Sequence, residues 1–152
     1  MKKTEKLLIL LVVVLIAGLA IISCDKDSGT ESGISALYGT WNMLSMHMRM
    51  TVAGIVFMDT TETPGPGEYT HVTLNENGTY ETNEMYDGIP ETGTGTYTIE
   101  GDSVTISDFD EEGPQTFKWN VAGNILTLKK NMVETDEGIV NTLDLEITFE
   151  KM

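Results

Sequence analysis

The stretch LDLEITFE at residues 143–150 constrains the fold more than any other feature of the chain, because apolar and polar side chains alternate in it without a break. Successive side chains of a β-strand point to opposite faces, so this pattern gives one buried face and one wet face. TFKWNV at 116–121 alternates in the same way. Such strands are typical of antiparallel sheets, whereas the strands of parallel sheets are buried on both faces.

Similar strand signals recur from Leu37 onward, and no window shows helical periodicity. Prolines and glycines at 64–67 exclude that stretch from a strand interior. The remaining apolar alternations predict strands near residues 40–52, 55–62, 69–75, 79–86, 94–100, 103–109, 115–121, 124–132 and 140–150.

Short glycine-containing turns join these strands. YTIEGDSVTI at 97–106 and WNVAGNILTL at 119–128 follow one pattern, and TLNENGTYET at 73–82 is a looser third copy. Glycine accepts the positive φ that tight hairpin loops require. Successive hairpins predict an antiparallel up-and-down meander, and closure removes its two exposed edges. We therefore predict an all-β barrel of eight or nine strands, with a two-sheet sandwich as the alternative.

The alternation also predicts which side chains lie inside. The candidates for the barrel interior are Trp41, Met46, Met48, Met50, Phe117 and Trp119. A common core is predicted for Trp41, Phe117, Trp119, Leu126, Leu128, Leu145, Ile147 and Phe149.

The segment MLSMHMRM at 43–50 combines four methionines with a histidine, which suggests copper(I) because that ion prefers soft ligands. Strand parity argues against a metal site. One face carries Leu44, Met46, Met48, Met50 and Val52, and the other carries Met43, Ser45, His47, Arg49 and Thr51. We expect the first face to be buried as a deformable apolar wall. His47 would then point outward beside Arg49, and only a β-bulge could bring it to the methionines.

The N-terminus has the pattern of an export signal. Three lysines in the first six residues precede an uncharged apolar run at 7–22, and the chain then becomes polar. The run is shorter than the roughly 18–20 residues expected of a spanning helix, although an uncleaved helical anchor remains the alternative.

The residues Ile21-Ile22-Ser23-Cys24 resemble the lipobox of bacterial lipoproteins. The resemblance implies that the chain is cut before Cys24, the only cysteine, and that its thiol carries a diacylglyceryl group. In that family the new amine is often acylated as well. Two or three acyl chains anchor a protein stably, whereas one holds it only marginally.

This resemblance divides the chain into three parts: a signal peptide at 1–23, a flexible acidic tether at 24–36 and a domain at 37–152. The protein is then expected in a bacterial cell envelope, attached to a membrane through Cys24. We expect the outer membrane or the cell surface rather than the inner membrane, although the leaflet is undetermined.

LYGTWNML at 37–44 resembles the opening of lipocalins and of lipocalin-like domains in small bacterial lipoproteins. There a Gly-X-Trp motif, here Gly39-Thr40-Trp41, begins the first strand, and its tryptophan plugs the closed end of the barrel. No arginine lies near the end of this chain to stack on the tryptophan, and Lys151 is only a crude substitute. The resemblance implies a non-enzymatic barrel that binds a small apolar or amphipathic ligand, without a cofactor.

Two further functions stay open. A formal charge of −15 excludes nucleic acid as a partner but suits a cationic protein, so the domain could inhibit a cationic host enzyme as some barrel lipoproteins do. Copper(I) binding is the third possibility. The acidic stretch DFDEEG at 108–113 lacks the ligand spacing of a calcium loop, and no catalytic motif is found. We expect a monomer.

Overall fold

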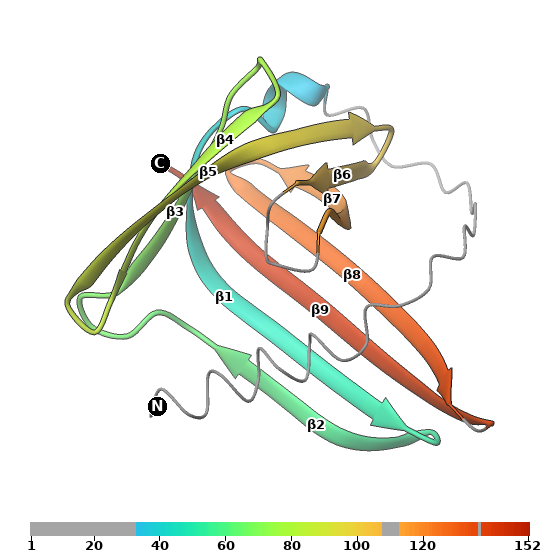
Figure 1. Ribbon diagram of the computed structural model, residues 1–152. Helices are drawn as coiled ribbons and strands as arrows, with labels where there is room; N and C mark the ends of the chain where they lie inside the picture. Colours follow the sequence, from blue (N-terminus) through green and yellow to red (C-terminus); the bar gives the residue numbers. More distant parts are fainter. Residues whose placement is uncertain (1–32, 108–112, 137) are drawn as a thin grey trace.

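The computed structural model describes residues 33–107, 113–136 and 138–152, and their strands form one antiparallel sheet (Figure 1). The elements are η1 (Ile34–Ala36), β1 (Gly39–Val52), β2 (Ile55–Glu62), β3 (Tyr69–Leu74), β4 (Thr79–Tyr86), β5 (Ile89–Glu100), β6 (Ser103–Ile106), β7 (Gln115–Ala122), β8 (Ile125–Asp136) and β9 (Ile139–Lys151). The predicted all-β meander is confirmed.

The sheet closes because β1 pairs with both β9 and β3. The strands β1 and β3 to β9 make a closed eight-stranded barrel, and β2 is an extra strand attached to β1. Every neighbouring pair is antiparallel, and the eight- to nine-stranded barrel expected from the sequence is confirmed.

Two strands are longer than their sequence signals. β5 begins at Ile89, before the predicted start at 94, and β8 continues to Asp136, beyond the predicted end at 132. Gly93 and Gly95 interrupt the apolar alternation, so the sequence pattern does not predict the first half of β5. In the structure this half pairs with β4 from Tyr86 to Thr79.

The closed end of the barrel is packed around the tryptophan of the Gly-X-Trp motif. Trp41 is fully buried, and its Nε1 donates a hydrogen bond to the carbonyl oxygen of Leu37 at 2.8 Å. Lys151 Nζ lies over the Trp41 ring, 5.2 Å from its centroid. Lys151 thus occupies the position next to the tryptophan for which the sequence offered no arginine. A cation over an indole face is attractive, so Lys151 helps to close this end.

The residues predicted for a common core lie together in the structure. Six of them are buried in one cluster: Trp41, Phe117, Leu126, Leu128, Ile147 and Phe149. Trp119 and Leu145 are partly buried and pack against that cluster.

A register shift in β1 corrects part of the predicted parity. In the pairing with β9, Met43 lies opposite Phe149 and Ser45 lies opposite Thr148, so Leu44 is an extra residue. Such a bulge reverses the alternation. Met43, predicted to face outward, therefore packs against the core beside Trp41, whereas Val52 is 36% exposed at the strand end.

The strands β2 and β3 share one edge of β1. β9 pairs with β1 from Trp41 to Val52, so both other partners must lie on the opposite edge. β3 takes the first part of that edge, at 39–42, and β2 takes the later part, at 46–52. The two strands then diverge, as Figure 1 shows at its lower left.

The predicted signal peptide at 1–23 and Cys24 lie outside the described residues, as does the acidic stretch 108–112. Of the residues assigned to the tether, Ile34–Ala36 form the short 3-10 helix η1, and Ala36 packs against the core. Within the described part, no helix has the length and apolar character needed to cross a membrane.

Candidate functional site

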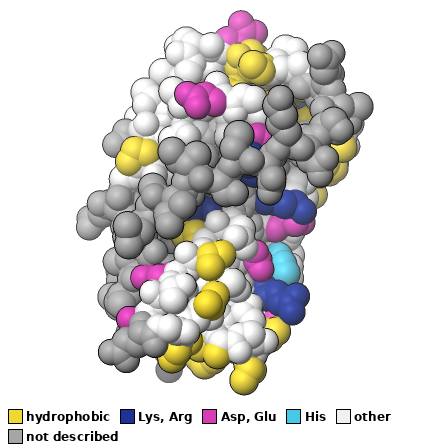
Figure 2. Space-filling model, turned by 90° about the vertical axis from the view of Figure 1, so that its right-hand side faces the viewer, with side chains coloured by type: hydrophobic (Ala, Val, Ile, Leu, Met, Phe, Trp, Pro, Cys, Tyr) yellow, Lys and Arg dark blue, Asp and Glu magenta, His cyan; other side chains and the backbone are white. Residues whose placement is uncertain are grey.

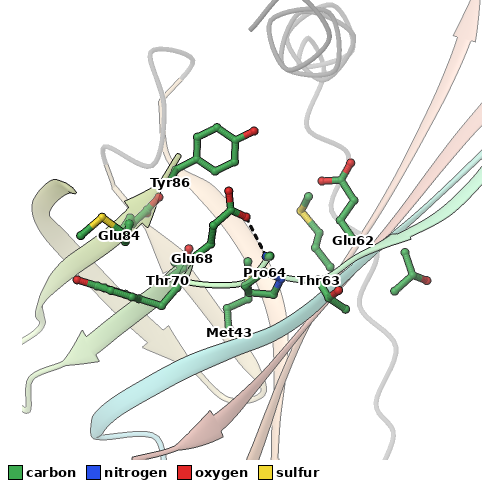
Figure 3. A pocket seen from close by; sticks show the side chains of 13 residues that line it. Met43, Glu62, Thr63, Pro64, Glu68, Thr70, Glu84 and Tyr86 are labelled. Atoms are coloured by element: carbon green, nitrogen blue, oxygen red, sulfur yellow. Dashed lines mark hydrogen bonds between the residues drawn. The ribbon is translucent and has the colours of Figure 1, made fainter. Parts of the chain in front are cut away.

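A cleft of about 460 Å³ opens where β2 and β3 diverge (Figure 3). The inner face of β1, the end of β2, the β2–β3 connection and the facing ends of β3 and β4 enclose it. The lining residues are Met43, Met46, Thr61, Glu62, Thr63, Pro64, Gly65, Glu68, Tyr69, Thr70, Glu84, Met85 and Tyr86. The cleft thus has an apolar floor, aromatic side chains and a polar rim.

Three carboxylates enter this lining, and none of the thirteen residues is cationic. Glu68 is fixed by the connection itself, because the Gly65 backbone N–H donates to its Oε2 at 2.8 Å. Figure 3 shows the Glu68 side chain between Tyr86 and Pro64, with Glu62 across the cleft. The cleft therefore combines negative charge with thioether and aromatic surface.

The apolar floor belongs to a larger methionine-lined wall on the inner face of the sheet. Cross-strand partners lie on the same face, so Met46 opposite the core residue Ile147 points inward, and Met48 and Met50 follow it. Met50 is opposite Met58 of β2 and also opposite Leu143 of β9. Leu143 in turn is opposite Met132 of β8.

Sequence reasoning missed Met43, Met58 and Met132 as members of this wall. Met58 and Met132 each stand alone in their strands, so only the cross-strand register shows that they join the stripe at 46–50. Unbranched thioethers adapt to neighbours of varied shape, which gives the wall a deformable surface.

The six candidate interior residues occupy two regions. Trp41 and Phe117 are fully or almost fully buried at the closed end, and Trp119 is partly buried against them. Met46, Met48 and Met50 lie on the wall, and of these only Met46 lines the cleft. The Trp119 Nε1 is buried without a hydrogen-bond partner among the described residues.

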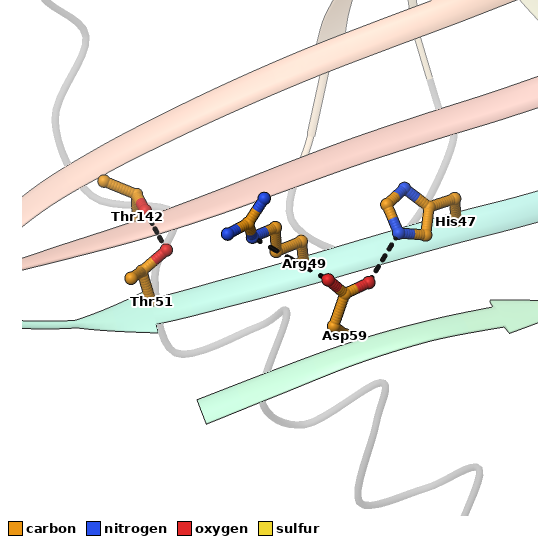
Figure 4. A network of polar contacts seen from close by, with 5 residues as sticks. All are labelled: His47, Arg49, Thr51, Asp59 and Thr142. Atoms are coloured by element: carbon orange, nitrogen blue, oxygen red, sulfur yellow. Dashed lines mark hydrogen bonds and ion pairs between the residues drawn. The ribbon is translucent and has the colours of Figure 1, made fainter. Parts of the chain in front are cut away.

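His47 lies on the opposite face of β1 from the methionines. Its Nε2 is 2.7 Å from Asp59 Oδ1, and Arg49 Nε is 3.8 Å from the other oxygen of the same carboxylate (Figure 4). These side chains are 42–51% exposed. The bulge at Leu44 lies before this segment, so it does not bring His47 to the thioethers.

Two groups away from the cleft have displaced pKa values. Burial, together with the nearby Tyr38 and Glu76, raises the pKa of Tyr97, whose hydroxyl donates to the Asn75 carbonyl oxygen at 2.6 Å. The hydrogen bond from Lys118 lowers the pKa of the exposed Asp102 carboxyl.

A second surface feature lies at the tips of the β1–β2 and β8–β9 hairpins. The Ala53 N–H donates to the Val140 carbonyl oxygen at 2.9 Å, so the two tips are joined. Figure 2 shows apolar side chains gathered at this lower end of the molecule. The exposed apolar residues there are Val52, Ile55, Val56, Phe57, Val133, Ile139 and Val140.

Comparison with known proteins adds one match. Residues 37–115 match the family described as lipocalin-like domain, which covers the Gly-X-Trp opening, the cleft and the strands through β6. No curated protein matches the chain significantly.

Proposed function

The chain belongs to the lipocalin-like domain family, and on that premise we propose that its barrel binds a small apolar or amphipathic ligand in the cleft between β2 and β3. We further propose that it acts without catalysis, as a lipoprotein of a bacterial envelope that is held at a membrane through Cys24.

The cleft is the observation that carries the proposed ligand binding. Its volume of about 460 Å³ falls within the roughly 300–1,000 Å³ of small-molecule sites. Its floor is apolar where Met43 and Met46 meet the core, and polar groups lie at its rim. A ligand with an apolar part and a polar part matches this division, because its apolar part would contact the floor and its polar part would contact the rim.

The proposed anchor rests on the sequence around Cys24 and on where the domain begins. The lipobox-like residues end ten positions before Ile34, the first residue of η1. A flexible chain of this length reaches about 17 Å on average, so the closed end of the barrel would lie near the membrane. The cleft between β2 and β3 lies beyond that end and would remain accessible.

A protein-binding role is the second candidate, and the apolar hairpin tips favour it. Ile55 and Phe57 are each 74% exposed, and contiguous apolar surface on a folded domain often marks a contact site. The acidic chain would suit a cationic partner such as a host enzyme. Ile55→Ser with Phe57→Ser should abolish such binding and leave small-ligand binding intact.

Displacement of a fluorescent amphiphile tests the first proposal. Thr63→Trp would fill the cleft from its rim without altering the core, and should weaken binding of the probe about tenfold or more. Met46→Gln should weaken it by making the floor polar. Met152→Gln is the matched control, because Met152 is 71% exposed at the chain end.

The thermal midpoint of each variant is measured beside its affinity, so that loss of binding is separated from loss of folding. Equal probe affinity for the parent and Thr63→Trp would contradict binding in the cleft. An effect of Met152→Gln equal to that of Met46→Gln would indicate non-specific adsorption instead.

A further inference from the structure

Two of the three carboxylates that line the cleft, Glu62 and Glu68, have no cationic partner within the described part of the chain. That part contains five lysines and arginines. Three pair with carboxylates elsewhere: Arg49 with Asp59, Lys118 with Asp102, and Lys129 with Glu146. The other two lie over aromatic rings: Lys130 over Phe117 and Lys151 over Trp41. Among the described residues, no lysine or arginine therefore supplies a counter-charge to Glu62 or Glu68.

Glu62 and Glu68 are the two carboxylates best placed to meet a ligand. Glu62 is partly buried at the end of β2, on the inner face opposite Met46, and its side-chain carboxylate makes no hydrogen bond or ion pair with the residues described. Glu68 uses one oxygen for the Gly65 N–H, which fixes the carboxylate and leaves the second oxygen available. In Figure 3 the two approach the cleft from different sides.

These carboxylates suit an organic cation better than a metal ion. Among the described residues, no group of three histidine, cysteine or acidic side chains is close enough to hold one ion. The Tyr86 ring and the thioethers of Met43 and Met46 complete the lining, and these groups favour a large, weakly hydrated cation with an apolar tail.

We propose that the ligand of the cleft is a cationic amphiphile, whose ammonium head lies between Glu62 and Glu68 and whose apolar tail lies along Met43 and Met46. This inference rests on the proposed ligand binding in the cleft and adds the charge of the ligand. Opposite charges near a protein surface attract more strongly than they do in bulk water, whereas the carboxylates of the cleft would repel an anionic head.

Three probes with the same ten-carbon tail test the charge. Decyltrimethylammonium, decyl maltoside and decyl sulfate are titrated into the lipid-free protein, which comprises residues 25–152 and so includes the tether and the domain. Binding is measured by calorimetry at about 0.15 M salt, with each probe below the concentration at which it forms micelles. At that salt, attraction to the distant acidic surface is largely screened. We expect the cation to bind at least about tenfold more tightly than the neutral probe, and the anion most weakly.

Matched variants locate the effect. Glu62→Gln and Glu68→Gln should each weaken decyltrimethylammonium about fivefold and change decyl maltoside less than about twofold. Glu81→Gln and Glu100→Gln remove the same charge from exposed positions outside the cleft, and should change neither probe.

The outcomes separate the two proposals. Equal affinity for the cationic and neutral probes, or equal effects of the cleft and control variants, would overturn the inferred charge and leave ligand binding intact. Failure of all three probes to bind would overturn both.

Discussion

Gly95 in β5 provides a sharp test of the packing, because one added methyl group should have the opposite of its usual effect. Alanine is normally favoured over glycine in a strand by roughly 0.5–1 kcal/mol. A Cβ at Gly95, however, would lie 2.5 Å from Cε1 of Tyr80, its partner across the β4–β5 pair. Tyr80 is 7% exposed, and its hydroxyl donates to the Ser107 carbonyl oxygen at 3.1 Å. The ring therefore cannot move aside without losing contacts.

The expected magnitude follows from these opposing terms. Overpacking of a core site costs about 1–3 kcal/mol, which the strand preference of alanine offsets only in part. Gly95→Ala should thus lower the free energy of unfolding by about 1–2 kcal/mol. For a domain of this size that corresponds to a fall in the thermal midpoint of roughly 4–8 °C.

Urea unfolding of four proteins measures the effect: the parent, Gly95→Ala, Tyr80→Leu and the double variant. Removing the ring should remove the clash, so Gly95→Ala should be neutral or stabilising in the Tyr80→Leu background. A Gly95→Ala protein as stable as its parent, or an equal loss in both backgrounds, would refute the reasoning.

Three further predictions concern the core, the alkaline limit and the anchor. Ile147→Ala, at a buried core position, should cost about 2–5 kcal/mol in urea unfolding, and unchanged stability would show that the strand parity of β9 is wrong. Tyr97 ionises more readily in the unfolded chain, so its contribution to the free energy of unfolding is complete below about pH 10 and is lost as the pH rises through its raised folded pKa. Tyr97→Phe should therefore reduce the loss of stability at alkaline pH. An unchanged dependence of stability on pH would count against this. Cys24→Ala should abolish metabolic labelling with fatty acid and leave an unprocessed or released form, and a parent protein that takes up no label would end the lipoprotein proposal.

Most of the strand pattern could be predicted because it depends on local signals. The alternation at 143–150 and the turns at Gly101 and Gly123 each act within a few residues, and both hairpins form where they indicate. The alternation also places Ile147 and Phe149 in the core. These signals hold because a strand with one apolar face has only one way to bury it.

What the sequence did not reveal depends on how the strands pair with one another. The bulge at Leu44 follows from pairing with β9, about a hundred residues later, and it turns Met43 inward against the expected parity. Room for Tyr80 at Gly95 is likewise visible only once β4 and β5 are paired.

The candidate site was the least predictable part, since it forms where two strands leave each other. Glu62 and Glu68 looked like ordinary solvated acids, because nothing local to them indicates that β2 and β3 share one edge of β1. The methionine stripe at 46–50 was the only signal, and it marked the wall behind the cleft rather than its charged rim.

Methyl NMR on methionine-labelled protein tests the central claim most directly, because thioethers lie both within the cleft and far from it. During titration with decyltrimethylammonium, the methyl signals of Met43 and Met46, which line the cleft, should shift together with one dissociation constant. The signal of Met152, exposed at the chain end, should remain in place. Shifts confined to Met152, or equal in size at all methionines, would contradict a ligand site between β2 and β3.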